Sequence, residues 1–236
     1  LMVLYDIDVT CNTNKMAISY TRILTSLIVM LSFAAFAQRP MAPDLHRAFQ
    51  HHKIDVYNRD LSLINEEGYH GIRLSKAFGE GIAWMKDITF STGTLEFDVR
   101  GEDLKQHSFV GIAFHGQNDS TYDAFYLRPF HFHAEDTVSQ NRMIQFISLP
   151  AFTWRKLRAE FPGRFEGHIS PPPDPIAWVH VSIEVTQESI TTYINGSNTP
   201  SLVAHPLKPL PPGKVGFYVA DTSGGDFANL TIINTR

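Results

Sequence analysis

Two tyrosines and an arginine stand at even-numbered positions in the segment YDAFYLRPFHF. Successive residues of a β-strand face opposite sides, so Tyr122, Tyr126 and Arg128 share one face. Phe125 and Leu127 fall on the other face, which suits a core. Aromatic rings stack on the C–H faces of sugars, and a guanidinium donates planar hydrogen bonds to oxygen atoms. The residue types on the first face therefore predict a site for a sugar.

Two further side chains complete this predicted sugar site. His115 lies near the end of the segment SFVGIAFHG, in which Gly111 and Ala113 share its face and leave room beside large planar rings. Gln145, in MIQFISL, adds an amide donor and acceptor if its strand lies next to the others. We expect a substrate-binding set of Tyr126, Arg128, His115, Gln145 and Tyr122. Trp84 and Trp154 are candidate stacking platforms.

The same residues have a structural interpretation, which the sequence leaves open. Loops at 130–142 and 162–177 could cover this face, and its tyrosines and arginine would then bond internally.

Glu96 and Asp98 are the weak candidates for a catalytic pair. A retaining glycosidase needs two carboxyl groups about 5–5.5 Å apart. Residues two apart on one strand face lie roughly 6–7 Å apart at the backbone, so distance does not exclude this pair. Carboxylates on a strand face are nevertheless mostly solvated. The catalytic residues, if the chain is an enzyme, stay unknown.

Oxygen-rich turns raise the question of a bound cation. Calcium prefers oxygen ligands, but Asx turns explain acidic residues in turns equally well, and we favour turns. His131 and His133, two apart, would need a third ligand to hold a transition metal. We therefore expect no metal and no cofactor, with structural calcium as the alternative. The weak calcium candidates are Asp119, Asp123, Asp221 and Asp226.

Composition excludes several classes of function. The net charge of −4 argues against a nucleic-acid partner. The sequence contains no Walker A motif, no G-x-G-x-x-G and no G-x-S-x-G, so nucleotide cofactors and a serine-hydrolase elbow are not expected. Cys11 is the single cysteine, which leaves no thiol chemistry once the first 37 residues are removed.

The first 37 residues have the pattern of a leader. Met16 is the expected start, Arg22 supplies the positive charge, and a short apolar run ends at a small-residue site at Ala37. We expect removal of residues 1–37 and a secreted or periplasmic product, with no membrane span in the mature chain; a signal anchor is the alternative. Residues 38–236 should then form one domain.

Strand patterns dominate the rest of the chain. TLEFDVRG (94–101) and WVHVSIEVT (178–186) alternate apolar and polar residues strictly, and 189–196, 213–220 and 226–233 continue the series. One helix is expected within 151–163. Many short strands with little helix predict an all-β sandwich of two antiparallel sheets.

Four motifs resemble the C-terminal half of concanavalin A-like jelly rolls. The chain is most similar to bacterial secreted domains of family-16-like or 3-keto-disaccharide-hydrolase-like type, over most of residues 50–233. The resemblance implies a jelly roll and a carbohydrate partner. The motifs span Trp178–Val181, Tyr193–Gly196, Gly213–Phe217 and Phe227–Ile232.

The resemblance does not settle activity, because this fold hosts lectins, lyases and hydrolases. The family-16 glycanase motif E-x-D-x-x-E is absent: the nearest run has Glu96, Asp98 and then Glu102, beyond the expected strand end. The leading hypothesis is a secreted domain that binds a glycan or sugar end on one sheet face. A glycoside hydrolase is the first alternative, and a laminin-G-like envelope interaction module is the second.

Overall fold

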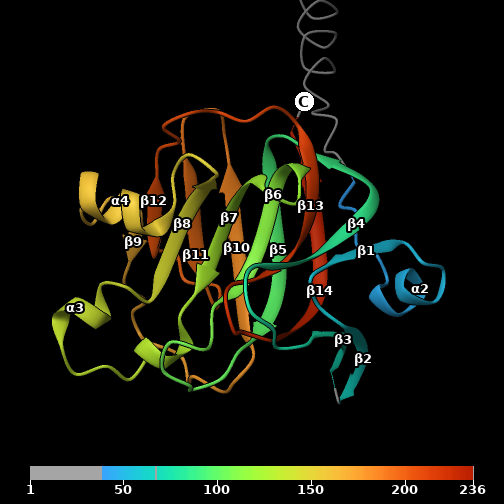
Figure 1. Ribbon diagram of the computed structural model, residues 1–236, viewed down its shortest axis with the longest axis horizontal. Helices are drawn as coiled ribbons and strands as arrows, with labels where there is room; N and C mark the ends of the chain where they lie inside the picture. Colours follow the sequence, from blue (N-terminus) through green and yellow to red (C-terminus); the bar gives the residue numbers. More distant parts are fainter. Residues whose placement is uncertain (1–38, 67, 236) are drawn as a thin grey trace, which may run out of the picture. The chain divides into compact units, whose positions relative to one another are not determined.

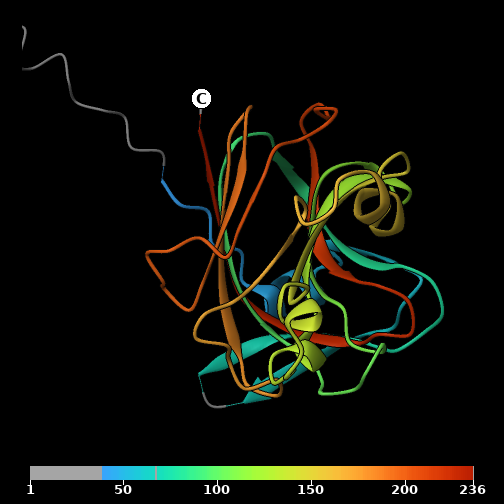
Figure 2. The same cartoon turned by 90° about the vertical axis from the view of Figure 1, so that its left-hand side faces the viewer.

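Two seven-stranded antiparallel sheets pack face to face in the computed structural model, which describes residues 39–66 and 68–235 (Figures 1 and 2). The all-β sandwich prediction is confirmed; the predicted leader lies outside the described residues. Sheet 1 consists, in spatial order, of β1 (Ile54–Tyr57), β4 (Gly81–Phe90), β13 (Gly213–Val219), β6 (Val110–Asn118), β7 (Thr121–Leu127), β8 (Ile144–Leu149) and β9 (Glu166–Gly167). Sheet 2 consists of β12 (Leu202–Ala204), β11 (Ile190–Ile194), β10 (Val179–Val185), β5 (Gly93–Arg100), β14 (Gly225–Asn234), β3 (Tyr69–Leu74) and β2 (Leu61–Glu66).

Aromatic contacts between the sheets fix which face of sheet 1 is the interior. Phe217 of β13 lies 6.2 Å from Phe97 and 4.8 Å from Phe227, ring centre to ring centre, and both partners belong to sheet 2. Phe217 pairs with Ile112, which pairs with Phe125. Since directly paired residues share a face, Phe125 points into the sandwich, as its alternation predicts.

Sheet 2 follows the alternation read from the sequence. Along β10 the odd-numbered residues Val179 to Val185 are buried, while His180 and Glu184 are exposed. Its outer face meets solvent, so polar residues there keep their hydration.

Sheet 1 differs because segments outside the strands cover its outer face. β7 and β8 are buried on both faces for most of their length. Figure 1 shows α3 (Thr137–Gln140) and α4 (Trp154–Glu160) at the β8–β9 end of the sheet, where α4 contacts β8 and α3 buries none of its side chains. Further cover comes from η1 (Pro129–His131), from Phe109, whose ring packs on Tyr126, and from Glu80, which bonds to Tyr122 and Tyr218.

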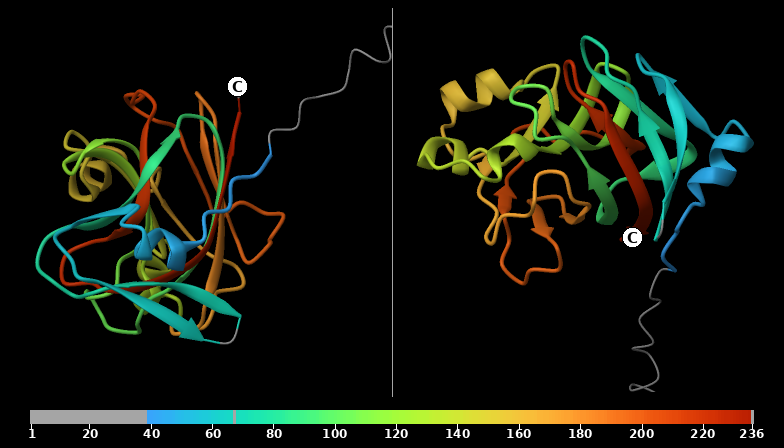
Figure 3. Two further views of the ribbon diagram at one scale, coloured as in Figure 1. Left: turned by 90° about the vertical axis from the view of Figure 1, so that its right-hand side faces the viewer. Right: turned by 90° about the horizontal axis from the view of Figure 1, so that it is seen from below.

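The helix expected within 151–163 is α4, which is shorter than that segment. It begins after Thr153, whose Oγ1 accepts a hydrogen bond from the Lys156 amide at 3.3 Å. The sequence reading missed α2 (Leu45–Gln50), which is capped by Asp44 and lies beside β3 (Figure 3). No helix among the described residues has the length and apolarity to cross a membrane.

Candidate functional site

One row of paired residues crosses the whole of sheet 1 on its outer face. Gly111 stands in the middle of the row, between Tyr218 and Tyr126, whose ring centres lie 5.8 Å apart. The missing side chain at Gly111 lets the two rings approach each other over the strand that separates them. The full row is Tyr57, Ile82, Tyr218, Gly111, Tyr126, Gln145 and Glu166.

Tyr122, Tyr126 and Tyr218 form a tyrosine cluster with Glu80. The Tyr122 hydroxyl donates to Glu80 Oε2 at 2.9 Å, and the Tyr218 hydroxyl donates to the same oxygen. All three tyrosine side chains are buried. A buried hydroxyl needs a partner, and Glu80 supplies one for two of them. The cluster therefore holds the outer face of sheet 1 together.

Burial raises the pKa of all three tyrosines, and the Glu80 carboxylate adds to the shift. The folded protein therefore keeps phenolic protons that the unfolded chain releases above its ordinary pKa of about 10. We expect the free energy of unfolding to fall by about 1 kcal/mol for each such tyrosine as pH rises from 10 to 11, because the unfolded tyrosine goes from about half to about nine-tenths ionised. Urea unfolding at several pH values measures this slope. Tyr122→Phe should make the slope shallower; an unchanged slope would contradict the assignment.

Arg128 is a buried cation whose two terminal nitrogens both donate to protein acceptors. Its side chain is 5% exposed. One terminal nitrogen donates to the Arg142 carbonyl at 2.9 Å and to Glu166 at 3.3 Å. The other donates to the Tyr126 hydroxyl at 3.3 Å and to Gln145 Oε1 at 3.0 Å. These bonds hold the guanidinium in one orientation without help from a ligand.

Glu166 is the counter-charge to three arginines. Its side chain is 6% exposed, and it pairs with Arg128, with Arg158 and, at 3.7 Å, with Arg142. The two-residue strand β9 positions it opposite Gln145. A Cβ at the neighbouring Gly167 would overlap the Ser201 carbonyl oxygen, so the chain needs glycine there.

A cavity of about 460 Å³ opens above Arg128, and we call it the basic pocket. Its cations come from four different segments of the chain, and aromatic rings make up much of the remaining wall. A pocket of this volume lies within the range of about 300–1,000 Å³ typical of small-ligand sites. The lining residues are Lys105, Gln106, Phe109, Arg128, Phe130, His131, Ser139, Arg142, Trp154 and Arg158.

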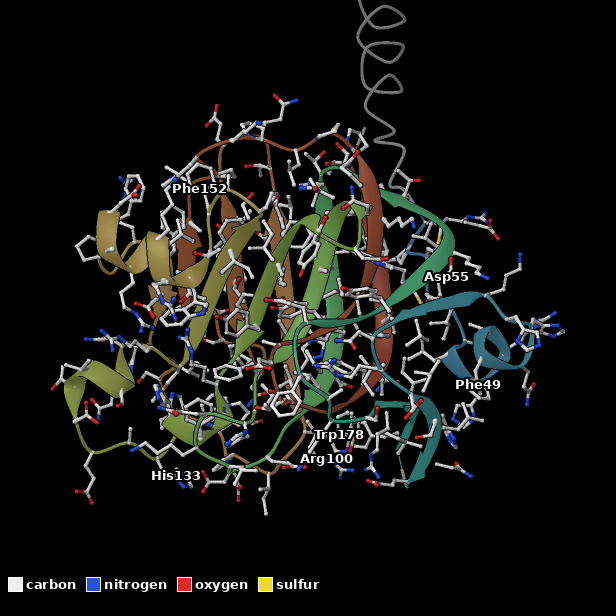
Figure 4. All side chains as sticks on the ribbon, viewed as in Figure 1. Phe49, Asp55, Arg100, His133, Phe152 and Trp178 are labelled. Carbon is white, nitrogen blue, oxygen red and sulfur yellow. The ribbon has the colours of Figure 1, made fainter. Side chains whose placement is uncertain are left out.

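Helix α4 presents two of these residues together. Trp154 and Arg158 are four apart, so they lie on one side of the helix. The guanidinium groups of Arg158 and Arg155 sit 4.9 Å and 5.2 Å from the centre of the Trp154 ring. Leu157 is buried and anchors the helix to the core. The Trp154 side of α4 is then left at the surface, where the residue is 39% exposed. Figure 4 shows Phe152 just before this helix.

The structure brings three of the five predicted sugar-binding residues into one bonded group. Arg128, Tyr126 and Gln145 contact one another, but only Arg128 lines the basic pocket. Tyr126 and Gln145 are enclosed and support Arg128 from below. Tyr122 belongs to the tyrosine cluster, where its hydroxyl is occupied by Glu80.

His115 lies apart from the other four. Its Nδ1 is 2.8 Å from Asp123 Oδ2 and its Nε2 is 2.6 Å from the Ser91 carbonyl oxygen. It lines a second cavity, of about 360 Å³, with Asp123 and the proline-rich segment 206–212. The pairing between β6 and β7 is irregular after Phe114, which turns His115 away from the row of Gly111. The structure therefore does not bring His115 to Arg128.

The weak catalytic candidates lie on the other sheet. Glu96 and Asp98 belong to β5 and point outward from sheet 2, away from the basic pocket. Asp98 is bonded to His180 at 2.7 Å and to Asn229 at 2.6 Å. A mechanism that combines this pair with the predicted sugar face would have to act through the sandwich, so the structure separates the two.

The four calcium candidates are occupied by separate protein partners. Asp119 accepts from Trp84 Nε1 at 2.8 Å, Asp221 accepts from the Gly79 amide at 2.7 Å, and Asp123 faces His115. Asp226 is paired with Arg73 and with Arg100, which lies over the Trp178 ring (Figure 4). Within 39–66 and 68–235, no three His, Cys, Asp or Glu residues are grouped to hold a metal.

Sequence reasoning missed most of the basic pocket. Of the two candidate stacking platforms, Trp154 lines the pocket, whereas Trp84 is buried and donates to Asp119. The four-residue spacing from Trp154 to Arg158 in the expected helix is a usable signal that the two residues face the same way. Glu166 had no such signal, because a strand of two residues has no periodicity.

Comparison with solved structures identifies the architecture. The chain is similar to the carbohydrate-binding module CBM66 from Bacillus subtilis, with a TM-score of 0.55 and 15% identity over 75% of this chain and 93% of that one. The fold is a concanavalin A-like jelly roll. At such identities the likeness shows the fold alone. The chain matches no protein-family model and no curated protein.

Two further structures share this jelly roll. One is a Bacillus subtilis protein of unknown function with a galectin-like fold, with a TM-score of 0.56 and 11% identity over 82% of this chain and 94% of that one. The other is a native glycosidic hydrolase, with a TM-score of 0.53 and 10% identity over 84% of this chain and 97% of that one.

Proposed function

We propose that this jelly roll is a carbohydrate-binding module that holds a sugar in the basic pocket. The observation behind the proposal is an exposed tryptophan beside two partly exposed guanidinium groups: Trp154, Arg142 and Arg158 line one cavity. A ring offers a stacking surface for the C–H face of a sugar, and arginine donors bind its oxygen atoms. Similar structures described as a carbohydrate-binding module and a glycosidic hydrolase support a sugar as the ligand.

Binding explains the pocket better than hydrolysis does. A glycosidase acting through the usual pair of carboxyl groups needs both at the scissile bond. Among the described residues that line the pocket there is no aspartate or glutamate. Glu166 lies beneath, where it is tied to three arginines. The proposal includes action outside the cytoplasm, in keeping with the leader expected in residues 16–37.

The test is a glycan array probed with the full chain, followed by Trp154→Ala on the best ligand. We expect Trp154→Ala to weaken binding roughly 30-fold, about 2 kcal/mol, as removal of a central aromatic contact does. Stability should hardly change, because Trp154 is partly exposed. The matched control is Phe78→Ala, which removes a still more exposed ring and should bind normally.

Two outcomes would count against the proposal. Wild-type affinity in Trp154→Ala would move the binding site away from the basic pocket. An array without any bound glycan, at low salt and with folded protein, would reject carbohydrate binding itself.

A further inference from the structure

The basic pocket contains more positive charge than its own residues neutralise. Lys105, Arg128, Arg142 and Arg158 line it, and Glu166 is the one carboxylate paired with any of them among the described residues. Three positive charges are therefore left over at a single cavity. The whole chain has a net charge of −4, so this local excess runs against the average of the molecule.

The Glu166 carboxylate lies too deep to fill the cavity where a ligand would bind. Its side chain is 6% exposed, whereas those of Arg142 and Arg158 are 34% and 28% exposed. The carboxylate thus lies under the arginines, and their outer edges face the cavity. Lys105 is exposed and makes no ion pair within the described residues, so its charge is available too.

Burial makes this charge effective toward a ligand. Charges at a partly enclosed, low-dielectric site interact more strongly than charges in open water. Arg128 is already oriented by Gln145, Tyr126 and the Arg142 carbonyl, so a ligand does not have to order it. A planar guanidinium is also the donor best matched to carboxylate, sulfate or phosphate oxygen atoms.

We infer that the sugar held by the basic pocket is anionic, with a carboxylate or sulfate group that contacts Arg142, Arg158 and Lys105 while its ring packs against the exposed part of Trp154. This inference rests on the proposed function and names the substrate class of the same site. A neutral sugar would leave the excess charge unmatched and would have to be bound despite it.

The experiment compares two pairs of hexasaccharides by titration calorimetry with the full chain. Hexagalacturonate and its methyl ester differ in the carboxylate charge, and a κ-carrageenan hexasaccharide and its desulfated form differ in the sulfate charge. We expect the anionic member of at least one pair to bind at least tenfold more tightly in 50 mM salt. This preference should shrink in 500 mM salt, where the screening length falls. The pair that shows the preference identifies the anionic group.

Variants then tie the preference to the pocket. Arg142→Ala and Lys105→Ala should each weaken anionic binding about tenfold, with little effect on folding, because neither residue is fully buried. Arg164→Ala is the matched control: it removes an exposed arginine that lies over Phe161 and does not line this pocket. It should bind within twofold of the wild type.

The outcomes separate this inference from the proposed function. Equal affinity within both pairs, or array ligands confined to neutral glycans, would overturn the anionic assignment and leave carbohydrate binding standing. Unaltered anionic binding in both pocket variants would also overturn it, because the charge responsible would lie elsewhere. Failure of every glycan on the array would reject the proposed function.

Discussion

Replacing Glu166 by alanine should destabilise the protein by about 3–5 kcal/mol, which is the usual loss when one partner of a buried ion pair is removed. Arg128 is 5% exposed and would remain in place without its counter-charge. Arg158 and Arg142 would also repel it more strongly. Urea unfolding followed by tryptophan fluorescence measures the loss.

Two companion variants make this prediction specific. Glu184→Ala removes an exposed carboxylate from β10 and should change stability by no more than about 0.5 kcal/mol. Adding Arg128→Met to Glu166→Ala removes the stranded charge, so the double variant should recover part of the loss. If Glu166→Ala unfolds at the wild-type urea concentration, the pair is not the buried contact described here.

Loss of Glu80 should be the second large effect, at about 2–4 kcal/mol. Glu80→Ala leaves the buried hydroxyls of Tyr122 and Tyr218 without their acceptor, and a buried hydroxyl without a partner costs about 1–3 kcal/mol. The cost stays below the full sum of both because Glu80 itself is only half-buried and water can reach its end of the cluster.

A double-mutant cycle checks this prediction. In the background Tyr122→Phe with Tyr218→Phe both donors are gone, so Glu80→Ala should cost much less there. Glu102→Ala is the matched control, because its ion pair with Lys76 is exposed and worth at most about 1 kcal/mol. An equal cost of Glu80→Ala in both backgrounds would show that the hydroxyl bonds contribute nothing.

The fold could be predicted because its signals are local. The alternation of β5 and β10 and the inward face of β7 follow from which side of each strand is apolar, and the structure has them as expected. The shortest strands could not be predicted from the sequence. β12 has three residues and β9 has two, which is too few to show an alternation of apolar and polar residues.

The site could be predicted only in part, because burial of a polar face depends on distant segments. Tyr126 and Arg128 do share a face, as alternation requires. Whether that face meets solvent depends on Phe109 and Phe130. The Phe109 ring packs on Tyr126, and the Phe130 ring packs on Phe109. Nothing in the spacing within β7 specifies that cover. The arginines of the pocket come from three separate segments that only the folded chain brings together.

The glycine after Glu166 links a backbone contact between the two sheets to the position of the Glu166 carboxylate. Gly167 lies against the carbonyl oxygen of Ser201, the residue before β12 of sheet 2. A side chain at position 167 would push β9 away from that carbonyl. The carboxylate would move with it, and the three guanidinium groups would lose the anion that offsets them. If the basic pocket binds an anionic sugar, as we infer, a substitution at position 167 should change the preference for ligand charge, although Gly167 does not line the cavity.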